Sequence, residues 1–95
     1  ATAWMRRLNR AASEAAVERG LRGGTDVTGF GLLGHGREMA AASGACLRLA
    51  ASRVPYLEGA REYADQWLFP AGGAANLEAC GADVRFADGV PEEDR

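Results

Sequence analysis

The side chains best suited to chemistry gather in the sequence TDVTGFGLLGH, residues 25–35. If its first four residues are extended, Asp26 and Thr28 project from the same side of the backbone. Thr28 is then a suitable N-cap for a following helix, and Gly29 and Gly31 leave backbone N–H groups open to an anion. A carboxylate just upstream suits Mg²⁺, which takes one or two carboxylates together with phosphate oxygens. The spacing therefore favours a metal-bridged phosphate site, with one simpler alternative: a capped helix preceded by a tight glycine turn.

The same stretch contains a literal G-x-G-x-x-G at residues 29–34, but its surroundings do not suit a dinucleotide. A Rossmann fingerprint needs a strong preceding strand and an acidic residue about 20 positions later. No Asp or Glu lies between Met39 and Leu57, and that window carries Arg48 and Arg53 instead. The chain also has no lysine, so a kinase or Walker lysine must come from elsewhere.

Composition limits the class of protein. The 95 residues are 47% apolar and 25% charged, which is ordinary for one globular domain or part of one. The net charge of −2 and the absence of a basic stripe argue against nucleic-acid binding. No apolar run approaches the roughly 18 residues that span a bilayer, so no membrane partner is expected. Cys46 and Cys80 are isolated, which predicts reduced packing residues in a cytoplasmic protein.

Apolar periodicity predicts three helices, at 3–19, 30–43 and 57–68, and two strands, at 45–50 and 82–87. Gly20, Gly44 and Pro70 are expected to end the helices. Residues 70–81 are expected to form a loop with at most a short helical turn. Pro91 and the three acidic residues after it predict another helix start, cut off by the end of the chain. The fold class predicted is α+β, a small mixed sheet covered by helices, with residues 1–95 forming one partial domain.

Residues 25–45, TDVTGFGLLGHGREMAAASGA, resemble the start of the C-terminal domain of selenophosphate synthetase (selenide, water dikinase). This family shares a two-domain plan with aminoimidazole ribonucleotide synthetase. Residues 12–20, 53–64 and 69–78 extend the resemblance over nearly the whole chain. Among the departures, Gly24 stands for the usual alanine or cysteine, Gly36 for a larger apolar residue, and Trp67 where a glycine is common.

The resemblance implies an ATP-dependent enzyme that converts selenide, ATP and water into selenophosphate, AMP and phosphate, using Mg²⁺ and a monovalent cation such as K⁺. It implies that Asp26 is a Mg²⁺ ligand and that Thr25, Thr28, Gly29 and Gly31 lie near the phosphates. The family's reactive cysteine or selenocysteine and its lysine belong to an N-terminal ATP-binding domain that is missing here. The 95-residue chain is therefore expected to hold no catalytic residue, to be inactive alone, and to belong to a homodimer when intact.

Two further polar residues leave alternatives open. His35 is either a phosphate or proton contact, or a helix-face residue that bonds a nearby backbone group. Asn76 either belongs to a second polar turn near the site or caps the short helix after it. Two other functions also remain, namely another ATP-dependent enzyme of the same superfamily and a binding or assembly module without catalysis.

Overall fold

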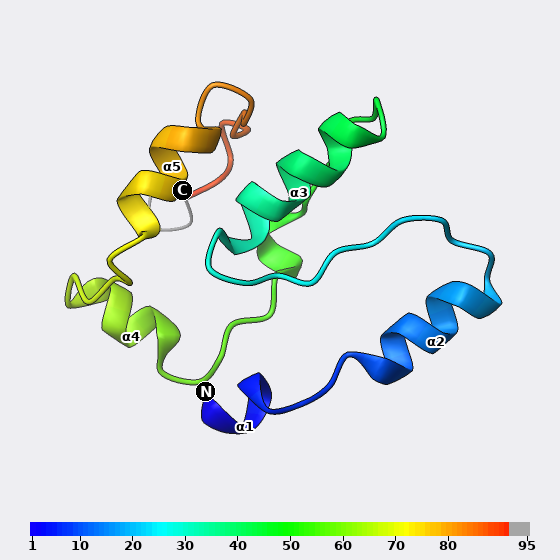
Figure 1. The fold of residues 1–95 in the computed structure, drawn as a ribbon. Helices are drawn as coiled ribbons and strands as arrows, with labels where there is room; N and C mark the ends of the chain where they lie inside the picture. The colour runs from blue at the N-terminus through cyan, green and yellow to red at the C-terminus, as the bar shows by residue number, and fades with distance from the viewer. Residues whose placement is uncertain (92–95) are drawn as a thin grey trace.

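The computed structural model describes residues 1–91, which form short helices joined by long connections (Figure 1). The elements in chain order are α1 (Thr2–Met5), α2 (Arg10–Glu18), α3 (Gly31–Ala42), the 3₁₀-helix η1 (Ala51–Arg53), α4 (Ala60–Asp65) and α5 (Gly73–Cys80). Helices α3 and α5 make the main interhelical contact, and α2 stands apart from them. The helix start predicted at Pro91 extends into residues 92–95, outside the described residues.

The predicted α+β fold with a small mixed sheet was wrong, because residues 1–91 contain no strand. A strand is stable only where a neighbour completes its backbone hydrogen bonds. At the start of 45–50, the Ala45 N–H donates back to the Ala40 carbonyl of α3 at 2.9 Å. At 82–87, the Asp83 N–H likewise closes a turn onto α5. Alternating apolar residues predicted strands with one buried face, but residues 1–91 offer neither segment a neighbouring strand with which to pair.

The described part of the chain is open, with little apolar burial. Its radius of gyration is 14.8 Å, whereas a compact chain of this length has about 12 Å. Among residues 1–91, Cys80 is the only buried apolar side chain, and Cys46 is exposed, so the packing role predicted for both cysteines holds only for Cys80. Large apolar side chains such as Trp4 and Phe69 are exposed. The described residues therefore form little hydrophobic core of their own.

The first predicted helix, 3–19, is in fact two helices separated by residues 6–9. Asn9 is the residue before α2, and asparagine favours helix boundaries over helix interiors. Arginine side chains clustered at the break repel one another across helical spacing. Within α2, the Arg10 guanidinium donates to the Glu14 carboxylate at 2.6 Å, one turn later. The ion pair of this region therefore lies after the break, inside α2.

Glycine ends two of the helices as the sequence predicts. Gly20 has φ +70°, and the N–H of Leu21 after it donates to the Ala16 carbonyl at 3.0 Å. Gly44 has φ +60° and closes α3 in the same way. Both are Schellman motifs, in which a left-handed residue lets the chain satisfy the last carbonyls.

The third Schellman motif, at the end of α4, carries Trp67 instead of glycine. Trp67 has φ 60°, its N–H donates to the Ala64 carbonyl at 2.8 Å, and the Leu68 N–H donates to the Tyr63 carbonyl at 3.0 Å. This motif ends the helix before Pro70, so the predicted stop at Pro70 was wrong. The indole is 85% exposed, so burial offsets little of the backbone strain.

Trp67→Gly is expected to stabilise the end of α4, because left-handed backbone costs an L-residue about 1–2 kcal/mol and costs glycine little. Amide hydrogen exchange of the full-length gene product should show the Leu68 N–H exchanging roughly fivefold more slowly, which corresponds to about 1 kcal/mol. Trp67→Ala is the matched control, since it removes the ring and keeps the strained backbone. Equal slowing in both variants would show that the ring, not φ, is responsible.

Candidate functional site

A tight turn leads into α3 and sets the shape of the loop before it, residues 25–30, which we call the candidate loop. The Gly31 N–H donates to the Thr28 carbonyl at 3.0 Å, and Gly31 has φ +71°. The N-cap of α3 is Phe30, and no side chain caps the helix. The prediction that Thr28 caps this helix was therefore wrong. The prediction that the Gly31 N–H is open to an anion was wrong as well, because that N–H donates to the Thr28 carbonyl within the turn.

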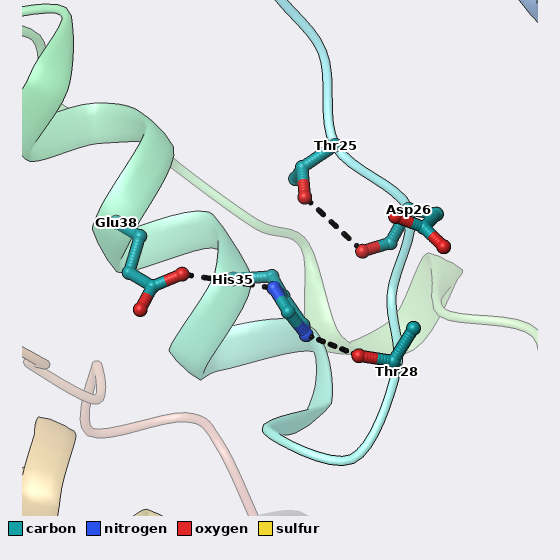
Figure 2. A network of polar contacts seen from close by, with 5 residues as sticks. All are labelled: Thr25, Asp26, Thr28, His35 and Glu38. Carbon is teal, nitrogen blue, oxygen red and sulfur yellow. Dashed lines mark hydrogen bonds and ion pairs between the residues drawn. The ribbon is translucent and has the colours of Figure 1, made fainter.

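The Thr28 side chain bonds His35 instead. Its hydroxyl oxygen lies 2.9 Å from Nε2 of His35, the fifth residue of α3 (Figure 2). The other ring nitrogen, Nδ1, lies 3.7 Å from the Glu38 carboxylate. The Phe30 ring packs at a tilt against the imidazole, with ring centroids 5.6 Å apart. His35 thus contacts side chains, which differs from the backbone bond considered from sequence.

Helix α5 contacts the same loop through Asn76. The Asn76 side-chain amide donates to the Gly29 carbonyl at 2.8 Å, across 47 residues of sequence. Asn76 lies inside α5, so the expectation that it caps a following helix was wrong. The expected loop at 70–81 is largely this helix. The structure therefore brings Asn76 to the loop that carries the other candidate residues.

Asn76→Asp is expected to loosen the loop, because the carboxylate has no N–H to donate and places an oxygen against the Gly29 carbonyl. Loss of one such hydrogen bond costs about 1 kcal/mol. Exchange of the Gly31 N–H in the full-length gene product should speed up roughly fivefold. Gln66→Glu, the same amide-to-acid change at an exposed residue of α4's end, should leave that exchange unchanged. If both variants speed the exchange of the Gly31 N–H equally, the added charge is the cause, and loss of the Asn76–Gly29 hydrogen bond is not.

Asp26 lies on the extended segment just before this turn and is exposed. The Thr25 hydroxyl donates to the Asp26 backbone carbonyl at 3.1 Å, so this hydrogen bond does not involve the Asp26 carboxylate. Figure 2 shows the Asp26 carboxylate turned away from α3, whereas the Thr28 hydroxyl faces His35. Within residues 1–91, no group of three or more His, Cys, Asp or Glu residues is arranged to hold a metal ion. Asp26 can therefore supply one carboxylate ligand, and a complete site needs further ligands.

The glycines of α3 allow close packing around the loop. A Cβ on Gly34 would lie 3.1 Å from Phe30 Cβ, and one on Gly36 would lie 2.9 Å from a methyl of Leu47. Gly36 is the buried residue of this helix. The helix tolerates glycine here because neighbouring groups approach its backbone closely.

Two charged partners were missed from the sequence. Glu38 lies three residues after His35 on one helix, a spacing that places the two side chains on one face and could have been recognised. The second is Asp83, which accepts from the Arg37 guanidinium at 2.5 Å across 46 residues. No local pattern signals that pairing. It joins α3 to the segment after α5, and the hydrogen bond to Asp83 together with its charge raises the pKa of Arg37.

In the described residues, every helix is too short or too polar to cross a bilayer.

The chain matches the model of the family "AIR synthase related protein, C-terminal domain" over residues 2–89, and so it belongs to that family. This match includes the loop before α3 and the helices α3 and α5. The superfamily inferred from the sequence is thereby confirmed.

Among curated proteins, the chain is similar to several named selenide, water dikinase. It is 45% identical over 87 residues to that of Nitratidesulfovibrio vulgaris, covering 92% of this chain and 25% of the relative. It is 48% identical over 68 residues to that of Caldanaerobacter subterraneus subsp. tengcongensis, covering 72% and 20%. With that of Trichlorobacter lovleyi it is 44% identical over 92 residues, covering 97% and 27%.

The resemblance to selenophosphate synthetase stated from the sequence is confirmed by these matches. The chain spans about a quarter of the length of the curated relatives that it matches. No solved structure matches it.

Proposed function

We propose that this chain is part of a selenide, water dikinase, an enzyme that converts selenide, ATP and water into selenophosphate, AMP and phosphate. The similarity to relatives of that name supports the reaction. The observation that carries the chain's own role is the exposed Asp26, which lies two residues before a turn held from two sides. His35 contacts that turn through Thr28, and Asn76 contacts it through Gly29.

In this proposal, Asp26 supplies one Mg²⁺ ligand at the ATP phosphates. Its donor chemistry suits the ion, because Mg²⁺ binds through one or two carboxylates plus phosphate and water oxygens. When bound, Mg²⁺ neutralises charge that develops on the transferred phosphoryl groups. The remaining protein ligands and the reactive group come from an N-terminal ATP-binding domain of the same polypeptide. Thr25 and Gly29 shape the loop, since their polar groups are bonded within it or to α5.

Separating the chain from its proposed partner domain tests this division of roles. The full-length gene product is expected to consume ATP when Mg²⁺ and selenide are supplied, and the purified 95-residue chain is expected to show no ATP consumption above buffer. The measurement is AMP formation followed by chromatography. Turnover by the isolated chain would contradict the proposal, because it would place the reactive groups within residues 1–95.

A further inference from the structure

His35 lies between two oxygen partners, one at each ring nitrogen. Nε2 is 2.9 Å from the Thr28 hydroxyl, and Nδ1 is 3.7 Å from the Glu38 carboxylate. The imidazole is only 12% exposed, whereas the Glu38 side chain is 62% exposed. Phe30 packs against the ring. The imidazole is therefore fixed in place although the residues around it reach solvent.

The two partners determine which nitrogen carries the proton. A neutral imidazole has one N–H donor and one acceptor nitrogen, and an ionised carboxylate can only accept. A proton on Nδ1 faces the Glu38 carboxylate favourably, while a lone pair there would be repelled by it. Nε2 is then the acceptor. The Thr28 hydroxyl must donate its only hydrogen to His35.

This direction of the hydrogen bond changes what Thr28 can do. A hydroxyl that gives its hydrogen to His35 has none left to donate to a phosphate oxygen. Thr28 thus ties the loop to α3, and a phosphate contact through its hydrogen is excluded while the imidazole is neutral. The tie lies two residues after Asp26, and the Asn76 bond to Gly29 holds the next residue of the same loop.

We propose that His35 is a positioning residue for the cation site: with its proton held on Nδ1 by Glu38, it accepts from Thr28 and fixes the loop that presents Asp26. The inference rests on the proposed function for the identity of the cation. The hydrogen-bond direction rests on this chain's own geometry. Residues that hold a metal-binding side chain in position typically change metal affinity 10- to 100-fold.

The first test is independent of activity. Nitrogen-15 NMR of the histidine rings in the full-length gene product, with the His35 signals assigned by their loss in His35→Phe, is expected to show the proton on Nδ1. Glu38→Ala should move the population toward the Nε2–H form. Glu78→Ala, a matched exposed glutamate on α5, should not. The proposal is overturned if the wild-type ring is protonated mainly on Nε2, or if Glu38→Ala leaves the populations of the two forms unchanged.

The second test measures binding of Mn²⁺, a paramagnetic stand-in for Mg²⁺, by electron paramagnetic resonance. Thr28→Val and His35→Phe are each expected to weaken Mn²⁺ binding roughly tenfold. The double variant should bind Mn²⁺ as tightly as either single variant, because each single substitution already removes the same Thr28–His35 contact. Thr28→Ser, which keeps the hydroxyl and remains informative where His35→Phe does not fold, should retain wild-type affinity.

Asp26→Asn separates the two proposals in the same assay. If it weakens Mn²⁺ binding while Thr28→Val does not, the positioning role of His35 fails and the proposed function stands. If Asp26→Asn leaves Mn²⁺ affinity unchanged, the metal role in the proposed function fails. The NMR result then still decides the direction of the Thr28–His35 bond.

Discussion

Asp26→Asn in the full-length gene product is expected to lower Mg²⁺-dependent ATP consumption by roughly 10²–10³-fold, the usual effect of removing one preorganised electrostatic contact to a transition state. The amide keeps the size of the side chain and removes its charge. Because Asp26 is exposed, the variant should fold as the wild type does. Steady-state rates across a Mg²⁺ titration measure the effect, and part of the activity should return at high Mg²⁺.

Asp88→Asn is the matched control, since Asp88 is also exposed and lies on a turn far along the chain from the candidate loop. Its rate and Mg²⁺ dependence should match those of the wild type. Wild-type turnover by Asp26→Asn at low Mg²⁺ would contradict the metal role. A similar loss in Asp88→Asn would attribute the effect to overall charge.

Gly31→Ala is expected to impair the use of Mg²⁺ about as strongly as loss of the Thr28–His35 contact, because Gly31 has φ +71° and closes the turn onto the Thr28 carbonyl. Left-handed backbone costs alanine about 1–2 kcal/mol, which favours other conformations of the loop that carries Asp26. The Mg²⁺ concentration for half-maximal rate should rise about tenfold, since 1.4 kcal/mol corresponds to a factor of ten.

Gly29→Ala offers the matched control within the same turn. Gly29 has no positive φ, and no atom lies within 4 Å of a Cβ added there. We therefore expect this variant to keep nearly the wild-type Mg²⁺ dependence. Equal effects of the two alanines would show that the left-handed conformation at Gly31 is not what shapes the site.

The helices were the part of the fold that sequence patterns predicted best, because their signals are local. Gly20 and Gly44 mark the ends of α2 and α3 through the single residue that needs positive φ. The strands at 45–50 and 82–87 were wrong for the converse reason. Alternation indicates one covered face, but a strand also needs a partner, and none lies in residues 1–91.

The candidate site divides in a similar way. Asp26 and the glycine turn were recognisable from TDVTGFG, and His35 was noted without its partner. The Asn76 bond to Gly29 joins residues 47 positions apart, so no local pattern could predict it. The assignment of Thr28 as a helix cap was wrong because its hydroxyl bonds His35, seven residues later. A bond to a side chain of the following helix, not capping of its backbone, decides the role of Thr28.

The most direct test of the central claim is phosphorus-31 NMR of the full-length gene product incubated with ATP, Mg²⁺ and selenide. We expect AMP, phosphate and a selenium-coupled phosphorus signal to appear together, all three to require selenide, and Asp26→Asn to slow all three. ATP consumption that proceeds to ADP without selenide, with no selenium-coupled signal, would contradict the central claim.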